Sequence, residues 1–203
     1  MRHLLLLSAA LLILPLSGCG KPPAPPPPAA EETAPPVIDP LSLAEADEAR
    51  AALHAGDYPA ALSASDRAIR LDRRNFNAWS ARGLAAALAG QPEEGIRLIG
   101  KALALSPDFV QGWYDMAIAQ KLGGHYTESI AFFQKVIAAD PQNTWSYYGI
   151  AANYADLKDR DRAVSYLSSA LSLDRGPVSE AARTQDHFLW LHGDPAFEAL
   201  FQP

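Results

Sequence analysis

A spacing of 34 residues recurs along this chain in residues of several different kinds. It is kept by three aromatic residues, three glycines, four apolar residues of small to medium size and two prolines: Trp79, Trp113 and Tyr147; Gly56, Gly90 and Gly124; Ala68, Ala102, Val136 and Ala170; Pro107 and Pro141. Because large, small and turn-forming residues share one period, we expect each period to be one pair of packed helices. Stacked pairs form an extended concave surface, so the pattern favours binding a partner over catalysis in a pocket.

The pattern inside one period is helical. In residues 110–143, Trp113, Met116 and Ala117 fall on one face of a helix, and Gly123 and Gly124 separate this helix from the next apolar run. Ser42 and Glu45 have the spacing of a capping box, which predicts a helix start at Ser42. No stretch alternates with a period of two over the length of a strand, so we expect an all-α fold.

The segment 110–143 resembles a tetratricopeptide repeat in its aromatic, small, glycine, aromatic and proline positions, which are Trp113, Ala117, Gly124, Tyr126 and Pro141. The resemblance implies an α-solenoid of about four helix-turn-helix repeats in residues 41–177, namely 42–75, 76–109, 110–143 and 144–177. The outer repeats depart from the family pattern, with Glu45 in place of the aromatic residue and Lys158 in place of the glycine. Such departures are usual in terminal repeats, which face solvent on one side.

Residues 1–18 have the pattern of a secretory signal: a short positive start, an apolar run from Leu4 to Leu14, and then Leu-Ser-Gly before Cys19. These last residues resemble the lipobox of bacterial lipoproteins, which implies that Cys19 is acylated and becomes the new N-terminus. Cys19 is the single cysteine of the chain, so a disulfide within the chain is not its purpose. A signal cleaved elsewhere and an uncleaved anchor are the alternatives.

Residues 19–40 then read as a disordered linker, because six prolines lie between positions 22 and 28. The linker would act as a spacer between the membrane and the repeats, or the proline run would itself be a ligand for an aromatic groove. Residues 178–203 are expected to cap the last repeat with helical segments, the final one starting at Asp194 and Pro195. The alternative for this segment is a binding role, with a docking site at Trp190 and Phe201.

The residues point to no catalytic machinery, so we expect a protein that is not an enzyme and uses no cofactor. The chain has neither a phosphate-binding glycine loop nor a Gly-x-Ser-x-Gly turn. His187 and His192 could hold a metal loosely with neighbouring aspartates, but their spacing matches no metal motif and we expect no metal site. The formal net charge of −6 and the lack of a basic stripe argue against nucleic acid as a partner. We also expect no small-molecule substrate.

The face of each first helix that remains after the core is assigned predicts the binding groove. Exposed tryptophan and tyrosine most often carry binding energy at interfaces, and three aromatics lie on this face. The alternative is that Trp145 and Tyr148 pack against the neighbouring helix or the C-terminal segment. The predicted groove residues are Asn77, Ser80, Leu84, Gln111, Tyr114, Asp115, Ile118, Trp145, Tyr148 and Asp156.

Together these features predict a membrane-anchored, non-enzymatic scaffold of the bacterial cell envelope that binds a partner peptide or helix in its concave groove. The alternative function is a dedicated chaperone that keeps one exported subunit, of pilus or secretin type, soluble until assembly. Gly20 after the lipidated cysteine resembles outer-membrane sorting in bacteria with two membranes; with a single membrane, the anchor would lie in its outer leaflet.

Overall fold

The computed structural model describes residues 37–202, and in this part of the chain every regular element is a helix. The expected all-α fold is therefore confirmed. The elements are α1 (Pro40–His54), α2 (Tyr58–Leu71), α3 (Phe76–Leu88), α4 (Pro92–Leu105), α5 (Val110–Leu122), α6 (Tyr126–Ala139), α7 (Thr144–Asp156), α8 (Arg160–Leu173), α9 (Arg175–Thr184), the short 3₁₀ helix η1 (Asp186–Leu191) and α10 (Pro195–Ala199). The predicted signal, Cys19 and most of the predicted linker lie outside the described residues.

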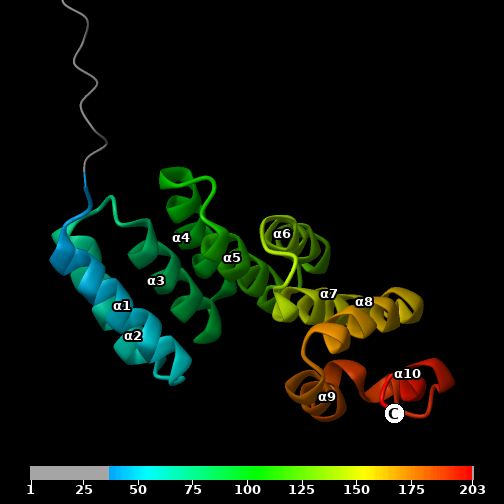
Figure 1. Ribbon diagram of the computed structural model, residues 1–203. Coiled ribbons are helices and arrows are strands. Elements are labelled where there is room, and N and C mark those ends of the chain that lie inside the picture. Colours follow the sequence, from blue (N-terminus) through cyan, green and yellow to red (C-terminus); the bar gives the residue numbers. More distant parts are fainter. Residues whose placement is uncertain (1–36, 203) are drawn as a thin grey trace, which may run out of the picture. The chain divides into compact units, whose positions relative to one another are not determined.

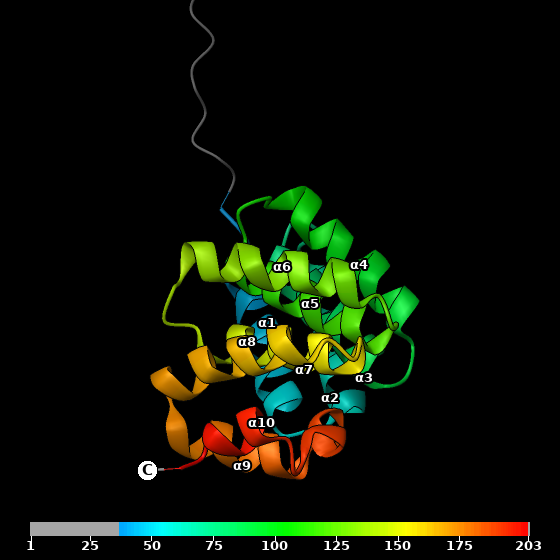
Figure 2. The same ribbon diagram turned by 90° about the vertical axis from the view of Figure 1, so that its right-hand side faces the viewer.

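The first eight helices form consecutive helix pairs, each made of a first helix (α1, α3, α5 or α7) and a second helix (α2, α4, α6 or α8). Figures 1 and 2 show the two helices of each pair side by side and the pairs following one another. The first helices also contact one another across the pairs: α3 packs closely on both α1 and α5. By contrast, α5 meets α7 at few points, and α6 supplies most of the contact with α7. The row of first helices is therefore open between α5 and α7.

Small residues let the two helices of a pair approach closely. Two of the 34-residue columns contain only alanine, glycine and serine, and all their members are buried: Ala49, Gly83, Ala117 and Ala151; Ala61, Gly95, Ser129 and Ala163. The approach is closest between α3 and α4, where a Cβ on Gly95 would lie 2.6 Å from the carbonyl oxygen of Gly83. In the next pair, the Ser129 hydroxyl donates to the carbonyl of Ala117 at 2.7 Å. These contacts explain why the repeat needs small residues at both positions.

In the second and third pairs, the tryptophan of the aromatic column joins the pair to the turn that precedes it. The indole of Trp79 donates to the carbonyl of Arg73 at 2.8 Å, and that of Trp113 donates to the carbonyl of Pro107 at 3.0 Å. Lys101 of α4 lies over the Trp79 ring, 4.5 Å from its centre. One period earlier, the same two positions hold Glu45 and Arg67, which form an ion pair at 2.7 Å. The first repeat thus replaces a cation–π contact with an ion pair.

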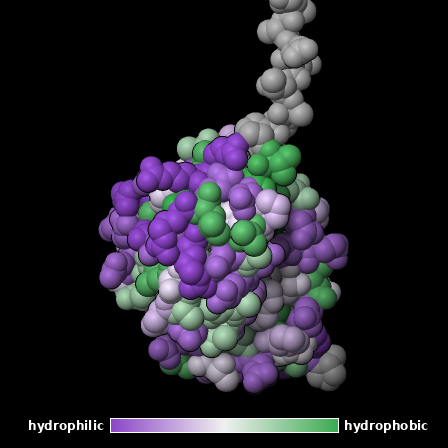
Figure 3. All heavy atoms as spheres, turned by 90° about the vertical axis from the view of Figure 1, so that its left-hand side faces the viewer, coloured by the Kyte–Doolittle hydropathy of each residue, from purple (hydrophilic) through white to green (hydrophobic). Residues whose placement is uncertain are grey.

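The N-terminal end of the stack is built from α1 and α2. Helix α1 begins at Pro40, with the Asp39 carboxylate accepting from the amides of Leu41 and Ser42, so the predicted start at Ser42 is wrong. Ser42 is instead buried and donates its hydroxyl to the Ala68 carbonyl at 2.8 Å. The capping-box pattern failed because the Glu45 side chain pairs with Arg67 rather than with the helix start. Figure 3 shows that this end of the molecule is mainly hydrophilic, with a small hydrophobic group near its centre.

The C-terminal segment covers the last helix pair. Helix α9, η1 and α10 bury Val178, Phe188 and Phe197 in one cluster with residues of α6, α7 and α8. The segment contains α9 and η1 rather than one helix, because Gln185 has an extended backbone between them. Asp194 accepts from the amides of Ala196 and Phe197, as its predicted capping role requires. No helix within residues 37–202 has the length and apolar character needed to cross a membrane.

Candidate partner-binding groove

Two pockets lie next to each other along the first helices, and both are lined by Gln111 and Tyr114 of α5. The first, called the α5–α7 pocket here, has a volume of about 120 Å³ and lies where these two helices separate. Its lining is Val110, Gln111, Tyr114, Val136, Asn143 and Trp145. The second, called the α1–α3–α5 pocket, has a volume of about 140 Å³. Its lining is Arg50, Leu53, His54, Leu84, Leu88, Gln111, Tyr114 and Asp115.

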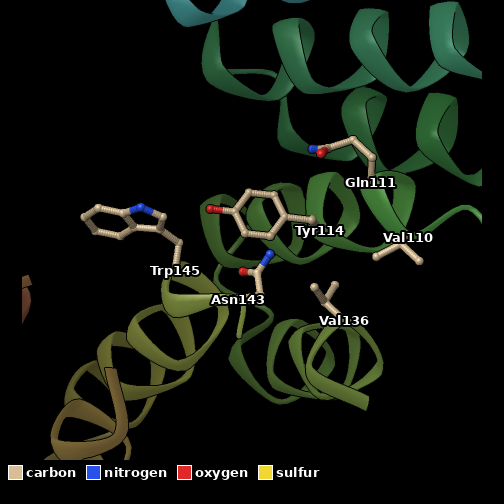
Figure 4. A pocket seen from close by; sticks show the side chains of 6 residues that line it. All are labelled: Val110, Gln111, Tyr114, Val136, Asn143 and Trp145. Carbon is tan, nitrogen blue, oxygen red and sulfur yellow. The ribbon is translucent and has the colours of Figure 1, made fainter. Parts of the chain in front are cut away.

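The α5–α7 pocket has an aromatic wall. Figure 4 shows the rings of Tyr114 and Trp145 projecting from α5 and α7 toward the same opening, with Asn143 beside Tyr114. Trp145 lies in the first turn of α7 and its side chain is 42% exposed. Its ring is held edge-on against that of Tyr148, with the centres 5.4 Å apart. Burial raises the pKa of the Tyr114 hydroxyl, and the charge of Asp115 adds to this effect. Tyr114 therefore keeps its proton and remains a hydrogen-bond donor at neutral pH.

The floor of the α1–α3–α5 pocket contains a charged group that is fully buried. The Asp115 carboxylate is 0% exposed and accepts a bidentate pair from Arg50 of α1, at 3.1 and 2.8 Å. Ser80 of α3 donates to the same carboxylate at 2.7 Å, and Gln111 donates at 2.8 Å. A buried carboxylate is tolerated only when its oxygens are paired in this way. Because Arg50 neutralises Asp115, the pocket offers Leu53, Leu84 and Leu88 as apolar surface without an uncompensated charge from this pair.

The structure brings together five of the ten predicted groove residues in these pockets: Leu84, Gln111, Tyr114, Asp115 and Trp145. The other five have different surroundings. Ser80 is buried beneath the pocket against Asp115, Ile118 packs on the hydrophobic core, and Asn77 is half-buried outside both linings. Tyr148 and Asp156 make contacts with the C-terminal segment. Whether this surface binds a partner remains a prediction.

Tyr148 is 6% exposed, so it supports the pocket rather than lining it. Its hydroxyl donates to Gln185 at 2.9 Å, and its ring packs edge-on against Phe188 of η1, 5.7 Å between centres. The predicted alternative of packing against the C-terminal segment therefore describes Tyr148, whereas Trp145 stays exposed, at 42%. The reason is that η1 covers the C-terminal side of α7 and leaves its first turn uncovered.

Asp156 is also engaged by the C-terminal segment. Its carboxylate lies 2.8 Å from Nδ1 of His187, and Nε2 of the same ring lies 3.0 Å from the Lys121 amine. Burial lowers the pKa of Lys121, although the charge of Asp156 acts in the opposite direction. His187 thus connects α5, α7 and η1. Within the described residues, no group of three histidine, cysteine or acidic side chains is arranged to hold a metal ion.

Several pocket residues were not in the predicted groove: Arg50, Leu53, His54, Val110, Val136 and Asn143. The 34-residue period could have found two of them, because Arg50 and His54 lie one period before Leu84 and Leu88. Val110 and Asn143 carry no such signal, and the 34-residue column that contains Val136 marks buried positions. These three residues line a pocket only because α5 and α7 separate at this point.

Comparison with known families identifies the class of protein that this fold defines. A sequence profile described as Tetratricopeptide repeat matches residues 46–107 and 89–144, and a second profile with the same description matches residues 146–177. The chain therefore belongs to the tetratricopeptide-repeat family. Family and fold together support a protein-interaction scaffold. No curated protein sequence matches the chain.

Solved structures share the fold at low sequence identity. The structure of MamA, residues 41 to the end, from Desulfovibrio magneticus RS-1 is 16% identical, with a TM-score of 0.59, over 81% of this chain and 95% of that chain. A second structure, described as a crystal structure of MamA protein, is 18% identical with a TM-score of 0.59, over 79% of this chain and 86% of that one. The first tetratricopeptide-repeat domain of Spaghetti (RPAP3), bound to the HSP90 peptide SRMEEVD, is 15% identical with a TM-score of 0.54; the match covers 60% of this chain and 99% of that one.

Proposed function

We propose that this chain is a lipid-anchored, non-enzymatic scaffold of the bacterial cell envelope, which binds a segment of a partner protein along α1, α3, α5 and α7. The observation that carries the proposal is the pair of adjoining pockets that share Gln111 and Tyr114. Their linings include Tyr114 and the exposed Trp145, and tyrosine and tryptophan are among the residues that most often carry the binding energy at interfaces. A peptide bound in a related repeat domain, that of Spaghetti (RPAP3), gives a precedent for this mode of binding.

The linings also indicate the chemistry of the bound segment. Arg50 is held by Asp115, so it is not free to bind an acidic tail as an isolated cation would. The rest of the α1–α3–α5 pocket is lined by three leucines together with His54, Gln111 and Tyr114. We therefore propose that apolar side chains of the partner enter this pocket, and that the pairing of Arg50 with Asp115 disfavours acidic ones.

Site-specific crosslinking in cells tests the groove. A photo-reactive amino acid at position 145 should form a covalent adduct with the partner, and Leu84→Glu should abolish that adduct by placing a charge in the apolar pocket. Position 190 is the matched control, because Trp190 is 39% exposed, similar to Trp145 at 42%, but lies on the C-terminal segment. The groove assignment fails if the same adducts form from both positions, or if Leu84→Glu leaves them unchanged.

The anchoring rests on the sequence of residues 1–19 and has its own test. We propose that Cys19 is acylated and holds the protein on the extracytoplasmic face of a membrane, because two or more acyl chains are sufficient for stable attachment. Mass spectrometry of the mature protein should find an acylated N-terminal cysteine. Cys19→Ser should release the protein from the membrane fraction. A mature N-terminus elsewhere, without acyl groups, would contradict the anchor and leave the groove proposal unaffected.

A further inference from the structure

The α5–α7 pocket presents hydrogen-bond donors that have no acceptor among residues 37–202. Within this part of the chain the Trp145 indole N–H, the Asn143 side-chain amide N–H groups and the Tyr114 hydroxyl make no hydrogen bond, and they are open to solvent in the pocket rather than buried without a partner. Gln111 uses its side-chain amide nitrogen for one bond, to Asp115, and keeps a second N–H. The Asn143 carbonyl oxygen already accepts from the amide and the hydroxyl of Ser146. The pocket is therefore rich in donors, and its own acceptors are partly used.

The rest of the lining is apolar and uncharged. Two aromatic rings, Tyr114 and Trp145, form one wall, and Val110 and Val136 complete the surface. None of the six lining residues carries a charge at neutral pH, since Tyr114 keeps its proton. A ligand with many donors would find few free acceptors here, namely the side-chain oxygens of Gln111 and Tyr114, and an ionic ligand would find no opposite charge in the lining.

A proline-rich segment has the complementary chemistry. Proline has no backbone N–H but keeps its carbonyl, so a run of prolines accepts hydrogen bonds and donates none. In the polyproline II helix these carbonyls point outward, and the proline rings pack against aromatic side chains. The conformation is already restricted in the free segment, which reduces the entropy lost on binding. Aromatic walls with donors between them are how other proline-binding folds recognise such segments.

The chain itself contains such a segment: residues 22–28 are six prolines and one alanine. At about 3.1 Å per residue, seven residues in this conformation extend roughly 22 Å. The α5–α7 pocket shares Gln111 and Tyr114 with the α1–α3–α5 pocket, so a segment that enters the first can continue toward the second.

We propose that the α5–α7 pocket binds a proline-rich segment in the polyproline II conformation, and that its occupant is the segment 22–28 of a second copy of this chain. The proposal rests on the proposed function, since it names the chemistry and the source of one segment bound along the first helices. In this arrangement, copies of the protein associate through segment 22–28 of one copy and the α5–α7 pocket of another. The contact is heterologous, so each copy offers one tail and one pocket.

Binding of a synthetic peptide tests the recognition chemistry. The receptor is the full chain in detergent micelles, with alanine replacing the prolines at positions 25–28, so that the added peptide is the source of intact proline segment. The probe is a fluorescently labelled peptide of residues 21–36, followed by anisotropy. We expect saturable binding, and we expect Trp145→Leu to weaken it at least tenfold. Tyr114→Phe removes only the hydroxyl donor and should weaken binding about fivefold.

Matched controls separate recognition from general effects. Trp190→Leu alters a tryptophan of similar exposure outside the pocket and should leave the affinity unchanged. A peptide with alanine at every proline restores the backbone N–H groups and should not bind. The chemistry is overturned if no saturable binding occurs, if the alanine peptide binds equally, or if Trp145→Leu has no effect while circular dichroism shows intact helices.

A second measurement tests the source of the segment. Two differently tagged full-length copies are co-expressed and one is purified in detergent. The second copy should co-purify, and Trp145→Leu in both copies should reduce this at least tenfold. Absence of co-purification, or tenfold tighter binding of an unrelated proline-rich peptide, would overturn the second copy as occupant. If both tests fail while the Trp145 crosslink still depends on Leu84, the proposed function stands and this inference falls.

Discussion

Helix α4 contains two glycines for which alanine should have opposite effects on stability. At Gly95, an added Cβ would lie 2.6 Å from the carbonyl oxygen of Gly83 and 2.7 Å from the Cβ of Ala87. These atoms belong to the backbone or to the first side-chain carbon, so no rotamer change relieves the clash. At Gly100, an added Cβ would have no other atom within 4 Å, leaving aside the helix's own nearby backbone. The two substitutions, five residues apart in α4, therefore allow the cost of overpacking to be compared with the gain in helix propensity.

The magnitudes follow from the two effects. Alanine in place of glycine inside a helix gains roughly 1 kcal/mol, because glycine loses more backbone entropy on folding. Overpacking costs about 1–3 kcal/mol, and a clash that only backbone movement can relieve belongs at the upper end. We expect Gly95→Ala to lose about 2 kcal/mol net and Gly100→Ala to gain about 1 kcal/mol.

Urea and thermal unfolding followed by circular dichroism measure both variants against the parent chain. For a chain of this size, 1 kcal/mol changes the melting temperature by about 2–4 °C. Gly95→Ala should therefore melt roughly 4–8 °C lower and Gly100→Ala a few degrees higher. Gly83→Ala, which faces the same contact from α3, should resemble Gly95→Ala. The reasoning is refuted if Gly95→Ala is as stable as the parent chain, or if the two variants of α4 shift in the same direction.

Three further changes test other contacts. Arg50→Met should cost about 3–5 kcal/mol in urea unfolding, because it leaves the buried Asp115 carboxylate without its cation; a loss below 1 kcal/mol would contradict the buried pair. Ending the chain after Gly176 should lower the melting temperature, since it removes the cover over Tyr148; an unchanged melting curve would refute the cap. Hydrogen bonds from Arg74 hold the pKa of Asp72 below its ordinary 3.8, so its stabilisation is complete above pH 3.8 and is lost as the pH falls through the lower folded value. The difference in melting temperature between Asp72→Asn and the parent chain should therefore be largest near neutral pH and shrink in acid. A constant difference from pH 7 to pH 2 would contradict stabilisation by the ionised Asp72 carboxylate.

The 34-residue period predicts the fold because each recurring residue makes its contacts within its own repeat or with the turn next to it. Gly83 and Ala117 lie where two helices approach, and Trp113 bonds to the turn before its helix. Neighbours in the sequence decide such features, so the period predicts them. It also places Arg50 one period before Leu84, a relation that only the structure showed to matter.

The remaining details depend on residues far apart in the chain. Asp115 was expected to be a groove residue free to meet a partner, but Arg50, 65 residues earlier, pairs with it at the floor of the pocket. Tyr148 was expected on the binding face, but Gln185, 37 residues later, covers it. No spacing in the sequence signals these two contacts, because the first crosses an entire helix pair and the second comes from a segment outside the repeats.

The contact between Arg50 and Asp115 has a consequence for how the protein comes apart. In most repeat arrays each unit touches only its immediate neighbours, so the ends open in small, nearly independent steps. Here the Arg50 guanidinium of the first unit pairs with the Asp115 carboxylate two units away, and Ser80 of the intervening unit donates to one of the same oxygens. If α1 alone separated from the stack, the buried Asp115 carboxylate would lose the Arg50 cation that neutralises it. Hydrogen exchange should therefore find the amides of α1, α3 and α5 released together, as a single block, rather than fraying inward from α1.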